Sequence, residues 1–143
     1  MTHEKRIEIR WRDLDAFRHV NNAVYATYLE ECRDEWLERA LGDAGDVDDF
    51  VLARVAIDFR NELTQEDDEV LVRCTLARVG TSSITVREEI RKLDGTLSAE
   101  AESVLVARDR ETGRSRPLTD AELAALTATL PPEAVQERAS YKL

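Results

Sequence analysis

The stretch RWRDLDAFRHVNNAVYATYLEECR, Arg10 to Arg33, decides the fold because its character changes half-way along. Its first half is a polar run of turn-forming residues without a period. Its second half carries apolar residues at helical spacing. Over Asn22–Leu41, which continues beyond the quoted stretch, these residues are Tyr25, Tyr28, Leu29, Cys32, Trp36 and Ala40. We therefore predict a heavily buried helix over Asn22–Leu41, capped by Asn21 or Asn22 and followed by a C-terminal glycine, Gly42.

The residues on either side of this stretch predict an antiparallel sheet. Alternating apolar residues indicate one strand before the helix and four after it. The expected strands are Arg6–Trp11, Val51–Phe59, Glu69–Val79, Ser83–Arg91 and Leu97–Arg108. Gly80-Thr81-Ser82 and Asp94-Gly95 are tight connections, and we expect the last four strands to form a meander. A last helix should begin at the Thr119-Asp120 cap and stop at Pro131-Pro132.

One aromatic helix and a long antiparallel sheet predict an α+β fold in which the sheet curls round the helix. No internal repeat or linker is visible. Such a sheet leaves its edge strands exposed, and pairing of edges across a two-fold axis is a common remedy. We therefore expect at least a homodimer.

Composition excludes several classes of protein. The chain has 143 residues, enough for one domain, and its 20 basic and 30 acidic residues give a net charge of −10, so we expect no nucleic-acid partner. Its apolar runs are too short to span a membrane, and the N-terminus lacks a signal-peptide pattern, so we expect a cytoplasmic protein. Cys32 and Cys74 match no zinc-binding spacing and should be buried thiols.

The polar run carries the residues best suited to chemistry. It ends at the start of the helix, where unpaired N–H groups and the macrodipole can polarise a carbonyl. Asp13 or Asp15 could then act as nucleophile or general base. The residues alone leave simpler roles open: the acids can bond the local backbone, Asn21 and Asn22 can cap the helix, and His19 can be a partly buried histidine. A metal site is not expected, because no third ligand follows at a suitable spacing.

The same stretch resembles the opening of hotdog-fold acyl-CoA thioesterases of the 4-hydroxybenzoyl-CoA thioesterase type. The family pattern W-x-D-x-D-x-x-G-H-V-N-N-x-x-Y is met at Trp11, Asp13, Asp15, His19, Val20, Asn21, Asn22 and Tyr25. The strand order extends the similarity over about Arg6 to Pro117, and Arg116-Pro117-Leu118 before the last helix is also familiar for this family. The usual glycine before His-Val is replaced by Arg18, which could change the loop shape or narrow the acyl pocket.

This resemblance implies a curved five-stranded antiparallel sheet wrapped around a central helix in a domain over residues 1–118, with residues 119–143 as a C-terminal helix and tail. It implies dimers with a continuous ten-stranded sheet, often paired into tetramers. The site would lie at the dimer interface, with no metal, no separate cofactor and no Ser-His-Asp triad. Asp15 aligns with the family's catalytic aspartate, and the backbone N–H near Asn22 aligns with the donor to the thioester oxygen.

We therefore predict hydrolysis of an acyl-CoA or acyl-carrier-protein thioester. Asp15 would either attack the carbonyl carbon or deprotonate a water molecule, and both routes stay open. His19, Asn21 and Tyr25 should shape the loop and pocket. Phe17 could line the acyl site or be a simple core aromatic.

Binding of CoA by so acidic a chain requires local arginines. The loop of Arg78, Gly80, Thr81 and Ser82 offers a guanidinium, hydroxyls and backbone N–H groups, although a plain hairpin turn fits it equally well. Glu31 could be a working carboxylate on the helix, but a solvated helix face is the preferred interpretation.

Three alternatives remain open. A non-catalytic hotdog module could bind acyl-CoA or acyl-carrier protein, but such a module has no need of Asp15. A hotdog dehydratase would need a histidine paired with an acid across the site, which His19 beside Asp15 matches poorly. A purely structural dimer is the third alternative.

Overall fold

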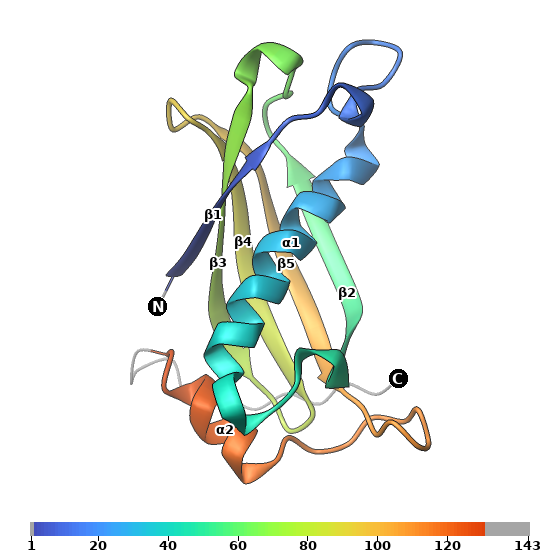
Figure 1. The fold of residues 1–143 in the computed structure, drawn as a ribbon, viewed down its shortest axis with the longest axis vertical. Coiled ribbons are helices and arrows are strands. Elements are labelled where there is room, and N and C mark those ends of the chain that lie inside the picture. Colours follow the sequence, from blue (N-terminus) through green and yellow to red (C-terminus); the bar gives the residue numbers. More distant parts are fainter. Residues whose placement is uncertain (1, 131–143) are drawn as a thin grey trace.

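The computed structural model describes residues 2–130 and contains a five-stranded antiparallel sheet with one long helix across one of its faces (Figure 1). The strands, β1 (Thr2–Glu8), β2 (Phe50–Phe59), β3 (Glu69–Val79), β4 (Ser83–Lys92) and β5 (Leu97–Ala107), lie in the order β1-β3-β4-β5-β2. The helices are α1 (Asn22–Leu41) and α2 (Asp120–Thr127). Single 3-10 turns are η1 (Trp11–Asp13), η2 (Gly42–Ala44), η3 (Val47–Asp49) and η4 (Gln65–Asp67).

The strand order corrects the predicted four-strand meander. β3, β4 and β5 follow one another through tight hairpins, but β2 pairs with β5, and β1 pairs with β3. Residues 60–68 join β2 to β3, which is longer than a tight hairpin allows, and they cross the upper end of the sheet in Figure 1. β1 and β2 are therefore the two edge strands.

The first strand differs from its predicted bounds, whereas α1 and β3 have the bounds expected. β1 begins at Thr2 and ends at Glu8, before Trp11. The backbone N–H of Arg10 donates to the Asp13 carboxylate at 2.9 Å, and this bond accompanies a turn at η1 that takes the chain out of the sheet. α2 ends at Thr127, although Leu130 beyond it is buried. The predicted Pro131-Pro132 stop lies outside the described residues.

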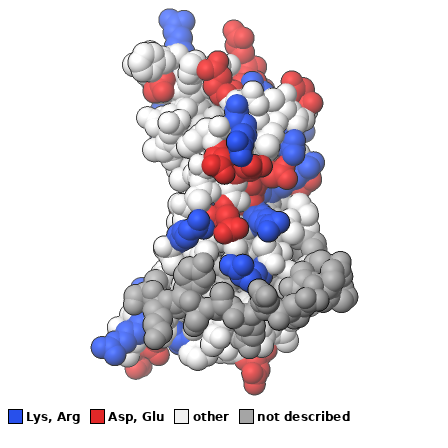
Figure 2. Space-filling model, turned by 180° about the vertical axis from the view of Figure 1, so that it is seen from behind, with Lys and Arg blue, Asp and Glu red and all other residues white. Residues whose placement is uncertain are grey.

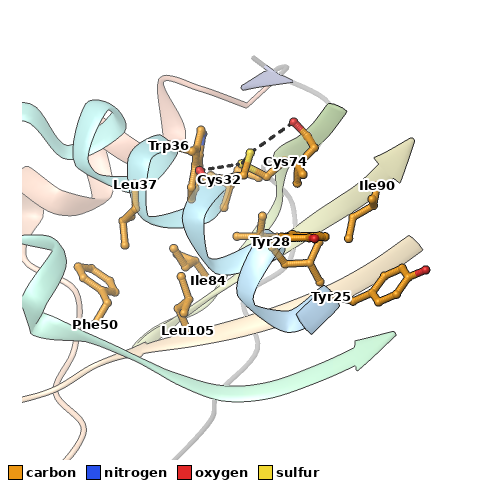
Figure 3. Packing of buried hydrophobic residues seen from close by; sticks show 14 of the residues in the cluster. Tyr25, Tyr28, Cys32, Trp36, Leu37, Phe50, Cys74, Ile84, Ile90 and Leu105 are labelled. Carbon is orange, nitrogen blue, oxygen red and sulfur yellow. Dashed lines mark hydrogen bonds between the residues drawn. The ribbon is translucent and has the colours of Figure 1, made fainter. Parts of the chain in front are cut away.

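The core lies between α1 and the sheet (Figure 3). Tyr28, Cys32 and Trp36 from one face of α1 are almost completely buried, which confirms the burial predicted for this helix. Cys32 and Cys74 are both buried free thiols, with their sulfur atoms 3.5 Å apart. Hydrogen bonding to Cys32, together with burial, raises the pKa of the Cys74 thiol.

The last described segment closes the lower end of the sheet in Figure 1. Arg116 forms a bidentate pair with Glu122 of α2, at 2.8 and 3.0 Å. The backbone N–H of Leu118 donates to the Thr81 carbonyl at 2.9 Å, and Leu126 is fully buried in the core. α2 therefore packs on the same core as α1.

The face of the sheet turned away from α1 carries charges of both signs (Figure 2). Cross-strand pairs on the sheet include Arg54 with Glu102 at 3.3 Å and Arg73 with Glu4 at 2.7 Å. Among residues 2–130, no helix is long and apolar enough to cross a bilayer.

Candidate active site

The polar loop between β1 and α1 is closed like a small hairpin. Leu14 pairs with Val20, and the backbone N–H of Asp15 donates to the His19 carbonyl at 2.8 Å. The N–H of Arg18 donates to the Asp15 carbonyl at 3.0 Å, so residues 15–18 form a tight turn. Arg18 has a φ angle of 65°, the left-handed region that favours glycine. Arg18 thus adopts a backbone conformation that glycine would adopt easily, and it adds a long side chain to the turn.

Asp13 has a structural role. It is only 3% exposed, and its Oδ2 accepts hydrogen bonds from the Arg10 N–H at 2.9 Å and from the Tyr28 hydroxyl at 2.7 Å. The Arg10 guanidinium bonds Oδ1 at 3.2 Å. Burial raises the pKa of this carboxyl, but these donors outweigh burial and hold the pKa below its usual value. Asp13 is therefore an ionised anchor between the loop and α1.

Asp15 lies in a different environment. Its Oδ1 accepts from the backbone N–H groups of Phe17, at 2.8 Å, and His19, at 3.2 Å. Its Oδ2 has no hydrogen-bond partner among the described residues. The turn therefore orients the Asp15 carboxylate through one oxygen and leaves the other oxygen available.

The start of α1 leaves one backbone donor unused. Asn21 is the N-cap, and its side-chain oxygen accepts from the Ala23 N–H at 2.9 Å, while its carbonyl accepts from the Val24 N–H. The N–H of Asn22 finds no acceptor in the described part of the chain. The Asn21 N–H donates to the Asp13 carbonyl at 2.9 Å and fixes the helix start to the base of the loop. The unpaired Asn22 N–H and the Asp15 carboxylate thus belong to one closed loop at the upper end of α1 (Figure 1).

A pocket of about 530 Å³ adjoins this loop. It is lined by Trp11, Leu14, Phe17, Arg18, His19, Thr64, Gln65 and Glu66. Trp11 is 83% exposed and Phe17 is 81% exposed, so Phe17 is not a core aromatic. The imidazole Nε2 of His19 lies 3.1 Å from the Glu62 carboxylate. The pocket thus combines two exposed aromatic rings with charged groups of both signs.

Tyr25 supports the helix rather than the pocket. Its hydroxyl lies 3.3 Å from Ser98 Oγ, and its ring meets Phe59 edge-on with centroids 5.0 Å apart. Burial raises the pKa of this phenol. Glu31 is exposed on α1, which confirms the solvated helix face.

The loop predicted to bind CoA lies elsewhere in the chain. The β3–β4 hairpin that contains Gly80, Thr81 and Ser82 is at the lower end of the sheet, opposite the Asp15 loop (Figure 1). Arg78 is half-buried, and its guanidinium reaches Thr85 Oγ1 at 3.4 Å. The Ser82 carbonyl accepts from the Ala107 N–H at 2.8 Å. A single chain therefore does not bring these residues together with Asp15.

A model of the thioesterase-like superfamily matches residues 9–138, which include the whole polar loop. The chain belongs to this superfamily. A thioesterase of Thermus thermophilus, solved in complex with coenzyme A and Zn, is 31% identical, with 89% of this chain and 92% of that chain covered and a TM-score of 0.79. A predicted thioesterase of Bacillus stearothermophilus is 25% identical over 97% of this chain and all of that chain (100%), with a TM-score of 0.80.

A 1,4-dihydroxy-2-naphthoyl-CoA thioesterase of Synechocystis shares the fold at 20% identity, with 88% and 96% of the two chains covered and a TM-score of 0.74. No curated protein matches the chain. Membership of the superfamily confirms the resemblance and the hotdog fold predicted from the Trp11–Tyr25 pattern, and with them the enzyme class, thioester hydrolase. The roles of individual residues stay predictions.

Several pocket residues of this thioesterase-like protein were not predicted from its sequence. Residues 64–66, which line the pocket, and Glu62, which pairs with His19, come from the connection after β2. The Val20 N–H bonds the Leu63 carbonyl at 2.8 Å and brings that connection beside the loop. No local pattern marks such a distant contact. Among residues 2–130, no group of three or more His, Cys, Asp or Glu side chains is placed to hold a metal ion.

Proposed function

We propose that the protein hydrolyses acyl-CoA thioesters and that Asp15 is the reacting carboxylate. The observation that carries the proposal is that only one oxygen of this carboxylate is hydrogen-bonded. Oδ1 accepts from two backbone N–H groups, and Oδ2 has no partner in the described chain. The same loop leads to the unpaired N–H of Asn22 at the positive end of α1. The coenzyme A bound by the Thermus thermophilus relative supports a CoA ester as substrate.

In the proposed reaction the thioester oxygen accepts a hydrogen bond from the Asn22 N–H. One such donor contributes about 3–4 kcal/mol of transition-state stabilisation in enzymes where it has been removed. Asp15 Oδ2 either attacks the carbonyl carbon, giving an anhydride that water then cleaves, or takes a proton from the attacking water. In both routes the C–S bond breaks, and the CoA thiolate leaves without a strong general acid.

The exposed edge strand supports a dimer as the working unit. Leu52, Val55 and Phe59 of β2 are exposed apolar residues on an edge to which no other strand of the described chain pairs. Antiparallel pairing of two β2 strands about a two-fold axis would turn the second sheet end for end. The β3–β4 hairpin of the second subunit would then lie at the same end as the Asp15 loop of the first. We infer that Arg78 and residues 80–82 contact CoA from the neighbouring subunit.

The test is thiol release from a panel of acyl-CoAs by the wild type and by Asp15→Asn. We expect Asp15→Asn to lower kcat by about a thousandfold or more while its melting temperature and acyl-CoA binding are retained. Glu31→Gln, which changes an exposed acid on α1, is the matched control and should keep the wild-type rate. A near wild-type rate in Asp15→Asn would refute the assignment. Binding without thiol release by the wild type would indicate the non-catalytic module.

A further inference from the structure

The pocket beside Asp15 contains a positive charge that the chain does not neutralise. Arg18 lines this pocket, and its guanidinium has no hydrogen-bond or ion-pair partner among residues 2–130. Glu66 lines the same pocket without pairing to it, and Glu62 is paired with His19 instead. Arg54 on the sheet is paired with Glu102, and the chain as a whole carries a net charge of −10. An unpaired guanidinium in a pocket is a binding group for an anion.

The backbone conformation at Arg18 gives no structural reason for an arginine at this position. Arg18 has a φ of 65°, a conformation that is unfavourable for a residue with a side chain. Glycine would adopt it easily, and asparagine nearly so. The turn therefore carries a long cationic side chain at a position whose backbone disfavours one.

The turn also limits which anion Arg18 can reach. The hydrogen bond from the Arg18 N–H to the Asp15 carbonyl keeps the two Cα atoms within about 7 Å. When Asp15 contacts the thioester carbon, Arg18 therefore extends from the same turn that positions the reacting carboxylate. The phosphates of CoA lie beyond the whole pantetheine arm. An anion held by Arg18 in that arrangement belongs to the acyl group.

Resting on the proposed thioesterase function, we propose that Arg18 binds a carboxylate at the far end of the acyl chain. The substrate class is then the monothioesters of short dicarboxylic acids. The exposed rings of Trp11 and Phe17, which line the same pocket, cover the methylene groups between the two ends. A carboxylate matches the planar fork of the guanidinium in a bidentate pair.

The experiment compares adipyl-CoA with hexanoyl-CoA, which have equal acyl carbon counts and differ by the terminal carboxylate. For the wild type we expect kcat/KM to favour adipyl-CoA by about tenfold or more, the effect of a charge-assisted pair. In Arg18→Gly, which fits the backbone of the turn, this ratio should fall to about one. Arg18→Lys keeps the positive charge but lacks the planar guanidinium that binds a carboxylate in a bidentate pair, so it should give an intermediate ratio of the two kcat/KM values. Arg87→Gln, at an exposed position of β4 outside the pocket, is the control and should keep the wild-type ratio.

A second pair of substrates separates the acyl carboxylate from the phosphates. The N-acetylcysteamine thioesters of adipate and hexanoate carry no phosphate, and the same preference and the same loss in Arg18→Gly are expected with them. Hydrolysis of hexanoyl-CoA without preference for adipyl-CoA, or a preference that survives Arg18→Gly, would overturn this inference and leave the thioesterase intact. A preference seen only with the CoA esters would assign Arg18 to a phosphate and overturn it too. Failure to hydrolyse any of the four esters would overturn this inference, and only inactivity on the whole acyl-CoA panel would overturn the proposed function as well.

Discussion

A buried ion pair ties α1 to the middle of the sheet. Arg33 Nη1 donates to Glu88 Oε2 at 2.9 Å and to Ser103 Oγ at 3.1 Å, and the Ser103 hydroxyl donates to Glu88 Oε1. Arg33 and Glu88 are 3% and 2% exposed. Burial raises the pKa of Glu88, with Arg33 acting against it, and Arg33 Nε has no hydrogen-bond partner within residues 2–130. The pair therefore carries a desolvation cost and an unsatisfied donor together with its attraction.

Changing one partner should destabilise the protein far more than changing both. Glu88→Gln leaves the Arg33 charge buried without a counter-charge, for which we expect a loss of about 3–5 kcal/mol. That is a large share of the roughly 5–15 kcal/mol of a typical domain. Replacing Arg33 and Glu88 together by Met removes both charges and also the unsatisfied Nε, which alone costs about 1–3 kcal/mol. We expect the double variant to lie within about 1 kcal/mol of the wild type or above it.

Urea unfolding at neutral pH, followed by circular dichroism, measures these free energies. The m-values of all variants should agree, because a constant m-value shows that the variants expose the same surface on unfolding. The reasoning fails if Glu88→Gln costs less than about 1 kcal/mol, since the pair would then not be desolvated as its burial indicates. It also fails if the double variant loses as much stability as the single one.

Three further predictions concern the loop and the thiols. Asp13→Asn should lower the unfolding free energy by about 1.5–3 kcal/mol, the usual contribution of hydrogen bonds to a charged group. Because the folded pKa of Asp13 is lowered, this contribution is present above the unfolded pKa and is lost as pH falls through the folded pKa. The melting temperature should therefore fall less steeply between neutral and strongly acidic pH in the variant than in the wild type, and identical slopes would contradict the assignment. Arg18→Gly should raise the unfolding free energy of the unliganded protein by about 0.5–1 kcal/mol through relief of its positive φ, and a lower melting temperature would argue against that strain. Cys32 and Cys74 should resist Ellman's reagent in the native protein and react in denaturant, because both are buried and the pKa of Cys74 is raised; rapid native labelling would count against the packing of α1 on β3.

Local patterns predicted the elements well, and they failed where the answer depended on distant residues. α1 and β3 have the predicted bounds because periodicity, the Asn21 cap and Gly42 all lie within the element or beside it. The pairing of β2 with β5 joins residues such as Val51 and Val106, which are far apart in the sequence, and no local turn pattern predicts this pairing. A meander was the simplest order for consecutive strands, but β1 occupies the free edge of β3.

The residues of the candidate site also divide into those that local sequence predicts and those that depend on distant contacts. Asp15, Arg18 and Asn22 stand in one short stretch whose loop and helix signals are readable, so their grouping was predictable. Thr64 reaches the pocket, and Glu62 reaches His19, only because the backbone at Val20 pairs with the connection after β2. The hairpin after Arg78 has suitable chemistry, but the length of β3 and β4 carries it to the other end of the sheet. Residue type alone does not specify which end of a strand a loop occupies.

Asp13 and Asp15 show how two identical residues acquire different roles within one loop. In an extended strand, residues two apart would face the same side. Here η1 ends at Asp13, and the tight turn begins at Asp15, so the first carboxylate meets Tyr28 of α1 and the second meets the N–H groups of its own turn. A carboxylate that anchors a loop must have its oxygens occupied, whereas one that attacks a carbon or takes a proton must keep an oxygen open. Loss of the Asp13 carboxylate should therefore weaken the fold that positions the Asn22 N–H. Asp15→Asn keeps an oxygen that can accept from the Phe17 and His19 N–H groups, so it should remove only the chemistry.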